Sequence, residues 1–143
     1  MKFALFTKLD SNENNDHIFS VFKSLDKHQL DYDVDSQSFD LISKLDNNNG
    51  GFNFSKVEKL SNEYDFVISI GGDGTILRSA NEIGELSIPI IGLNKGRLGF
   101  LANSPIEIID SIIEKITNSN YRISERTIIQ VEFEVKKKNA LNE

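Results

Sequence analysis

Phe66-Val67-Ile68-Ser69-Ile70 is followed directly by Gly71-Gly72-Asp73-Gly74-Thr75, and apolar residues at helical spacing come next, beginning with Ile76 and Leu77. The apolar run predicts a buried strand, the glycines predict a tight turn, and the spacing after them predicts a helix. A strand that enters a helix through such a turn brings free backbone N–H groups and a helix N-terminus to one place. The stretch therefore predicts a phosphate-binding turn.

Asp73 is the unusual member of this turn, because a carboxylate repels phosphate. A plain phosphate ligand is therefore a poor interpretation of this residue. Two functional interpretations remain, a base beside the phosphate or a metal ligand. A structural alternative also stands, since an aspartate ahead of a helix is often only its N-cap.

Strand and helix patterns alternate on both sides of the turn. Strands are expected at residues 2–7, 32–35, 66–70 and 88–93, and helices at 17–29, from Ser55, at 75–83 and from Ser104. This alternation is typical of a parallel sheet covered by helices. From residue 129 to 135 apolar and polar residues alternate, which indicates a half-exposed antiparallel strand. The predicted fold class is α/β, with a parallel-sheet, Rossmann-like domain over residues 1–102. A connecting helix and the first strands of a truncated all-β domain follow over residues 103–143.

A second glycine-rich loop, Asn94-Lys95-Gly96-Arg97-Leu98-Gly99, follows the strand at 88–93. Ligands of open parallel sheets bind beyond the carboxyl ends of the strands, so both glycine loops should line one cleft. Simpler interpretations are that Asn94 only caps the turn and that Phe100, taken singly, belongs to the core. The pairing of the two loops favours a binding site.

Composition excludes several function classes. The chain has 143 residues and a formal net charge of −6, which argues against nucleic acid as a partner. It has no cysteine, so disulfides, thiolate catalysis and cysteine-bound zinc are excluded. No segment approaches membrane-spanning length, and the apolar start at residues 1–6 is too short for a signal peptide. A cytoplasmic location with no membrane partner is the expectation by elimination.

The two loops together resemble those of the NAD kinases. Gly71-Gly72-Asp73-Gly74-Thr75 also occurs in the related diacylglycerol and sphingosine kinases. The second loop separates these families, because Gly92-Leu93-Asn94-Lys95-Gly96-Arg97-Leu98-Gly99-Phe100-Leu101 is similar to the NAD kinase pattern and not to that of the lipid kinases. Glu125-Arg126 and the terminal Ala140-Leu141-Asn142-Glu143 also resemble NAD kinases. The resemblance covers roughly residues 66 to 143.

The resemblance implies transfer of the terminal phosphate of ATP to the 2′-hydroxyl of the adenosine ribose of NAD, which makes NADP. It assigns Asp73 as the catalytic base, with Mg²⁺ offsetting phosphate charge and no protein side chain named as a metal ligand. Phe100 would pack on the adenine of NAD, and Asn94 would shape the second wall of the site. The nucleotide-binding set implied by the resemblance is Gly71, Gly72, Gly74, Thr75, Asn94, Phe100, Asn142 and Glu143.

The resemblance also implies a homo-oligomer in the full-length protein and a β-rich, NAD-binding second domain that begins within residues 103–143. The 143 residues by themselves are then expected to be inactive. Two alternatives remain open at this point. One is a diacylglycerol or sphingoid-base kinase of the same superfamily, and the other is a nucleotide-binding module without catalysis.

Overall fold

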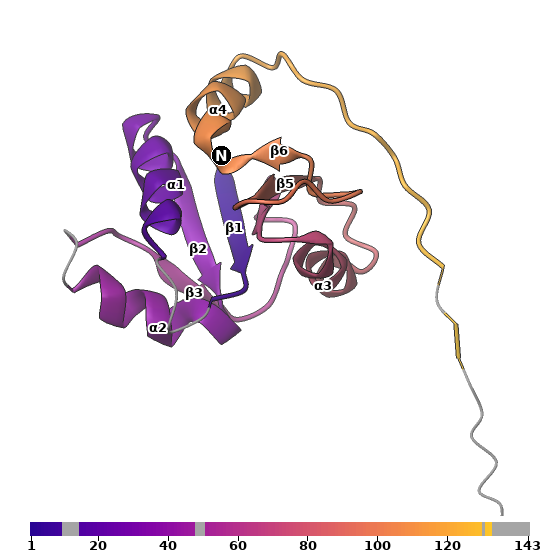
Figure 1. The fold of residues 1–143 in the computed structure, drawn as a ribbon, viewed down its shortest axis with the longest axis horizontal. Coiled ribbons are helices and arrows are strands. Elements are labelled where there is room, and N and C mark those ends of the chain that lie inside the picture. The colour runs from indigo at the N-terminus through magenta and orange to yellow at the C-terminus, as the bar shows by residue number, and fades with distance from the viewer. Residues whose placement is uncertain (10–14, 48–50, 130, 133–143) are drawn as a thin grey trace, which may run out of the picture.

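The computed structural model of the chain describes residues 1–9, 15–47, 51–129 and 131–132. Strands and helices alternate along the chain, as the ribbon in Figure 1 shows. The elements are β1 (Lys2–Thr7), α1 (Asp16–Lys27), β2 (Asp31–Asp35), α2 (Ser36–Asp46), β3 (Ser55–Val57), β4 (Phe66–Ile70), α3 (Asp73–Ile83), β5 (Ile90–Asn94), β6 (Ser104–Pro105), a 3₁₀ turn η1 (Ile106–Ile108) and α4 (Ile109–Thr117). The predicted α/β class and its parallel sheet are confirmed.

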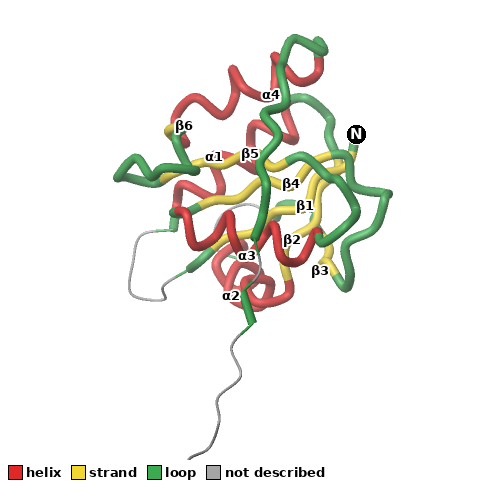
Figure 2. Tube along the Cα trace, turned by 90° about the vertical axis from the view of Figure 1, so that its right-hand side faces the viewer, coloured by secondary structure: helices red, strands yellow, loops and turns green. Residues whose placement is uncertain are grey.

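The described strands form one six-stranded sheet with the order β3-β2-β1-β4-β5-β6, and every pairing is parallel. The chain builds outward from β1 through β2 to β3, and then returns to the other side of β1 to build β4, β5 and β6. Strand order therefore reverses between β1 and β4. Figure 2 shows these two strands side by side in the sheet. In sheets of this kind the crevice at the reversal point is the preferred place for a ligand.

Both faces of the sheet are covered. One face buries Phe3, Leu5 and Ile68 beneath α1, α2 and α4, and α1 also contacts α4 directly. The opposite face buries Phe6 and Val67 beneath α3 and the segment that follows β3. Because both faces are buried, β4 is apolar along its length, apart from Ser69. This rigid double-sided packing fixes the positions of the loops that follow β1 and β4.

Two predicted helix starts are wrong. Ser55 begins the strand β3, which pairs in parallel with β2, and not a helix. Ser104 lies in the short strand β6 beside the end of β5, so helical structure begins only at Ile106, with the 3₁₀ turn η1. In both places an edge position beside an existing strand outweighs a local capping pattern. The predicted end of α3 at residue 83 is confirmed, and Gly84 caps the helix with a φ of 55°.

The strand expected over residues 129–135 falls largely outside the described ranges. Among the described residues beyond α4, those at 121–129 and 131–132 lie in no helix or strand. Figure 1 shows residues 121–129 leading away from the sheet as an extended segment. The division into domains at residues 102 and 103 stays a prediction, although α4 packs into the same core as β1. Within the described ranges, no helix is long and apolar enough to cross a membrane.

Candidate active site

The candidate site lies where the strand order reverses, beyond the carboxyl ends of β1 and β4. A hollow of ≈ 660 Å³ opens there. Three segments line it, the end of β1, the first two turns of α2, and the glycine turn with the first two turns of α3. The lining residues are Thr7, Lys8, Leu9, Gln37, Ser38, Leu41, Gly72, Gly74, Thr75 and Arg78. The structure thus places the predicted phosphate turn at the mouth of a cavity of ligand size.

The glycine turn needs a residue without a side chain at its first position. Gly71 has a φ of 152°, and its N–H donates to the carbonyl of Leu93 at 2.8 Å. A Cβ atom at Gly71 would lie 2.6 Å from Oγ1 of Thr75. Because Thr75 is buried in the first turn of α3, that contact cannot be relieved easily. Glycine at this position therefore allows β4 to turn directly into α3.

The Asp73 carboxylate bridges the two glycine loops. The Phe100 N–H donates to Oδ2 at 3.0 Å, and the N–H groups of Leu101 and Ala102 donate to Oδ1 at 2.9 and 3.0 Å. These amides, Ala102 most and then Leu101 and Phe100, hold the pKa of the Asp73 carboxyl below its ordinary value. A carboxylate accepts about four hydrogen bonds, so one lone pair on Oδ2 is left for another donor. Asp73 is thus both an anchor for the second loop and an ionised acceptor with one free direction.

Asn94 supports the same loop from below. Its side chain is 3% exposed. Nδ2 donates to the carbonyl of Ala102 at 3.2 Å, and Oδ1 accepts from the N–H of Gly96 at 3.3 Å. Asn94 therefore shapes the loop from within and does not face the hollow with a free amide.

Phe100 is not a core residue. Its side chain is 98% exposed, and the neighbouring Leu98 is 70% exposed. The backbone of Phe100 is fixed by Asp73, while its ring projects into solvent. An exposed ring on an anchored backbone is suited to stacking on a flat ligand. The interpretation of Phe100 as core is therefore wrong.

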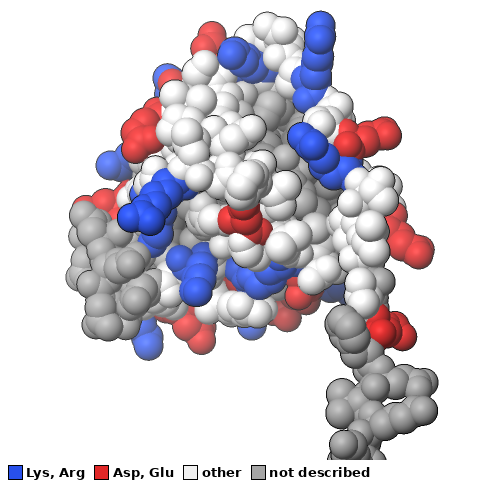
Figure 3. All heavy atoms as spheres, turned by 45° about the vertical axis from the view of Figure 1, so that its right-hand side comes forward, with Lys and Arg blue, Asp and Glu red and all other residues white. Residues whose placement is uncertain are grey.

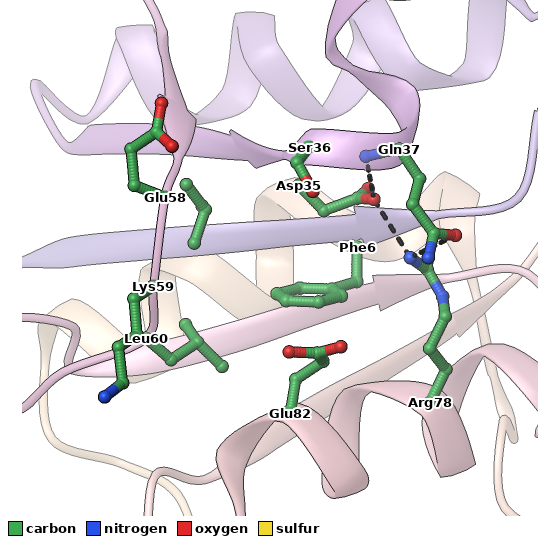
Figure 4. Close-up of a pocket in the computed structure, with 10 residues that line it drawn as sticks. Phe6, Asp35, Ser36, Gln37, Glu58, Lys59, Leu60, Arg78 and Glu82 are labelled. Carbon is green, nitrogen blue, oxygen red and sulfur yellow. Dashed lines mark hydrogen bonds and ion pairs between the residues drawn. The ribbon is translucent and has the colours of Figure 1, made fainter.

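Four residues of this region were not predicted from the sequence. Arg78 donates from Nη1 to Oδ1 of Asp35 at 2.9 Å and from Nη2 to the carbonyl of Thr7 at 2.7 Å. Figure 4 shows this pair beside a second, smaller hollow of ≈ 50 Å³, with Gln37 also facing Arg78. Arg78 is 24% exposed and pairs with the buried Asp35, so it is not a freely solvated residue of the helix surface. Its position four residues after Gly74 was an available signal, because that spacing places both on one helix face.

Thr7 ends β1 and Lys8 follows it, just as Gly71 follows β4. The rule that neighbouring parallel strands end at one edge could therefore have identified them from the sequence. Asp35 ends β2 and caps α2, accepting from the N–H of Gln37 at 3.1 Å. Its side chain is 3% exposed, so its charge is balanced by Arg78 and by backbone amides.

Two expected site residues and a metal site remain predictions. Asn142 and Glu143 lie outside the described residues. No group of three or more histidine, cysteine, aspartate or glutamate side chains able to hold a metal is present within the described ranges. On the face drawn in Figure 3, lysine and arginine side chains are spread around the periphery, an acidic side chain lies near the centre, and the basic side chains do not form a single patch.

Comparison with known proteins gives concordant matches. A sequence model of the ATP-NAD kinase N-terminal domain matches residues 13–121. The NAD kinase of Bacteroides fragilis is 36% identical over 131 residues, which cover 92% of this chain and 45% of that protein. The NAD kinase of Christiangramia forsetii is 32% identical over 133 residues, with the same coverage of 92% and 45%. The chain therefore spans about half the length of the curated relatives it matches.

Among solved structures, yeast NADH kinase complexed with NADH aligns with a TM-score of 0.65. The aligned part covers 83% of this chain and 38% of the yeast chain, at 17% sequence identity. At that identity the likeness concerns the fold alone.

Proposed function

The chain belongs to the NAD kinase family, and from this premise we propose that the full-length protein transfers the terminal phosphate of ATP to the 2′-hydroxyl of the adenosine ribose of NAD. Residues 1–143 supply the turn that holds the donor phosphates and the base that meets the acceptor hydroxyl. The remaining walls of the NAD site belong to the β-rich domain expected from residue 103 onward. The 143 residues alone are then inactive.

One observation supports this proposal above the others. Oδ2 of Asp73 accepts the N–H of Phe100, so the candidate base and the candidate adenine platform are tied to each other at 3.0 Å. In NAD the 2′-hydroxyl belongs to the ribose attached to the adenine. A dinucleotide whose adenine stacks on the Phe100 ring therefore brings that hydroxyl close to the remaining lone pair of Oδ2. Because Phe100 and Asp73 lie so close together, the hydroxyl that meets Asp73 should belong to the ribose attached to the stacked adenine, and not to a group farther along the acceptor molecule.

The lowered pKa of Asp73 shapes its role as a base. A weakly basic carboxylate does not remove a proton from a free ribose hydroxyl at neutral pH. It orients the hydroxyl, and it accepts the proton as the new bond to phosphorus forms and the hydroxyl becomes acidic. The same lowered pKa keeps Asp73 ionised at neutral pH, so its acceptor role does not depend on small pH changes.

The backbone N–H groups of Gly72 and Gly74 are proposed to hold the donor phosphates at the N-terminus of α3. Gly71 and Thr75 would shape the turn around the phosphates, because their own N–H groups donate to the carbonyls of Leu93 and Gly72. Mg²⁺ would neutralise charge on those phosphates. Few protein ligands are needed for this, because Mg²⁺ at such sites is held by one or two carboxylates together with phosphates and water.

The direct test is NADP formation by the complete chain supplied with ATP, Mg²⁺ and NAD. Parallel assays contain diacylglycerol, sphingosine or no acceptor. NADP as the product supports the proposal. Phosphorylated lipid would favour the lipid kinase alternative, and nucleotide binding without any transfer would leave only a binding module.

Phe100→Ala is expected to raise the KM for NAD roughly tenfold, because loss of base stacking costs about 1–3 kcal/mol. The KM for ATP should change less than twofold. Since the ring is 98% exposed, the melting temperature should stay within about one degree of the wild-type value. Steady-state kinetics and thermal unfolding measure these quantities. Equal weakening of both substrates together with a lower melting temperature would contradict the stacking role.

Gly99→Ala is expected to lower kcat/KM roughly tenfold, because a Cβ atom at Gly99 would run into Oδ1 of Asp73 and push the carboxylate out of place. Gly96→Ala in the same loop is the matched control, since a Cβ there meets nothing within 4 Å. Its kcat/KM should stay within about twofold of wild type. Equal effects of the two substitutions would show that loop flexibility, and not the position of Asp73, determines the rate.

We also propose a cytoplasmic location and a homo-oligomeric full-length protein, which follow from the family expectation. Size-exclusion chromatography with light scattering on the complete chain tests the second of these.

A further inference from the structure

The hollow of ≈ 660 Å³ lies between the N-termini of two helices and not beside one alone. Gly72, Gly74 and Thr75 line it from the start of α3, and Gln37 and Ser38 line it from the start of α2. Each helix of this length carries a partial positive charge at its N-terminus. An anion in the hollow therefore meets two such termini together.

Two cationic side chains line the same hollow, Lys8 and Arg78. Arg78 is balanced by Asp35. Lys8 is exposed, and it forms no ion pair with any residue in the described part of the chain. A net positive charge is thus left at the wall formed by the end of β1. The helix termini and Lys8 together favour an anionic ligand.

The Thr7 hydroxyl supplies an independent sign of a ligand. Thr7 lines the hollow and is 2% exposed, yet its Oγ1 has no hydrogen-bond partner in the described part of the chain. A buried hydroxyl left without a partner costs roughly 1–3 kcal/mol. The backbone of Thr7 is held on three sides. Its N–H donates to Asp35, and its carbonyl accepts from Ser38 Oγ at 3.0 Å and from Arg78 Nη2 at 2.7 Å. The hydroxyl is therefore fixed in place, with its hydrogen-bonding capacity unused among the described residues.

We propose that this hollow is a polyanion site in which the phosphate chain of the donor lies between the two helix N-termini, with Lys8 Nζ and Thr7 Oγ1 as direct ligands. The inference rests on the proposed function for the identity of the donor, and adds to the glycine turn a second wall built by β1 and α2. Arg78 is a positioning residue here, because it holds the Thr7 carbonyl and the cap of α2 in place. Lys8 and Thr7 would thus set the affinity for the phosphate chain independently of the acceptor.

The test measures binding of inorganic tripolyphosphate to the full-length protein by calorimetry, which requires no phosphoryl transfer. Lys8→Ala should weaken this binding at least tenfold. Lys44→Ala, which removes an exposed lysine from the last turn of α2, should leave it unchanged within about twofold. Thr7→Val keeps the shape of the side chain and removes only the unpartnered Oγ1, so it should weaken binding several-fold without lowering the melting temperature.

Kinetics of the same variants give the second measurement. Lys8→Ala should raise the KM for ATP about tenfold and leave the KM for NAD within twofold. Wild-type tripolyphosphate binding in Lys8→Ala, equal losses in the Lys8 and Lys44 variants, or no tripolyphosphate binding by the wild type would each overturn the inference. If the protein forms no NADP but its tripolyphosphate affinity depends on Lys8, the polyanion site stands and the proposed function fails.

Discussion

Asp73→Asn in the full-length protein should lower kcat by about a hundredfold or more, the loss typical of removing a general base. Asparagine keeps the size of the side chain and removes its charge and its ability to take a proton. Its carbonyl oxygen can still accept from the N–H groups of Leu101 and Ala102, as Oδ1 of Asp73 does. Its NH₂ group would face the N–H of Phe100, so only that one bond is lost. The affinity for NAD should therefore change no more than about threefold.

Steady-state kinetics and calorimetric titration of NAD separate the two roles of Asp73. A large loss of kcat with nearly unchanged NAD affinity supports the role as a base. Turnover close to wild type would remove Asp73 from that role. Parallel losses of kcat and NAD affinity would mean that Asp73 acts only by anchoring the second loop, and Gly99→Ala should then show the same parallel loss.

Arg78→Leu should lower the free energy of unfolding by about 3 kcal/mol and the melting temperature by roughly 10 °C. The reason is that Asp35, 3% exposed, would keep a buried charge without its partner at 2.9 Å. The substitution would also free the carbonyl of Thr7 from its bond to Nη2. Urea denaturation measures the free energy, followed through the transition that unfolds this sheet.

A double-mutant cycle tests the cause of that loss. Asp35→Asn combined with Arg78→Leu should destabilise the protein by less than the sum of the two single changes, because the charge that needs a partner is gone. Lys27→Ala is the control, since the Lys27–Asp110 pair has side chains that are 64% and 50% exposed. Its loss should cost less than about 1 kcal/mol. Arg78→Leu as mild as Lys27→Ala would show that the Asp35 pair contributes little.

The parts of the fold that were predicted correctly depend on residues that are close together in the sequence. β4, the glycine turn and α3 follow from a buried apolar run, from glycines and from helical spacing within residues 66–84. The errors at Ser55 and Ser104 arose where a capping pattern competed with strand pairing to a distant segment. Edge strands of two or three residues leave too weak a pattern to outweigh a local helix signal.

Some features of the candidate site could likewise be predicted from the sequence, and others could not. The topology of a parallel sheet was enough to bring the loops at 71–75 and 94–99 to one edge. It did not reveal that Asp73 accepts three N–H groups of the second loop, or that Phe100 projects into solvent. Burial of a single aromatic residue on an irregular loop depends on what packs over it, and no periodic pattern reports this.

Local order around residues 66–83 follows from the chain itself, because side-chain period and the conformational freedom of glycine act over a few residues. Tertiary folding alone decided the polar contacts, since Asp73 meets Phe100 across 27 residues, Arg78 meets Asp35 across 43, and Arg78 meets Thr7 across 71. Arg78 reaches Thr7 and Asp35 only because the strand order reverses and places β4 beside β1, whereas Asp73 reaches Phe100 because β4 and β5 are paired. The residues within the turn thus determine its local structure, whereas the order of the strands determines which charged and polar groups surround it.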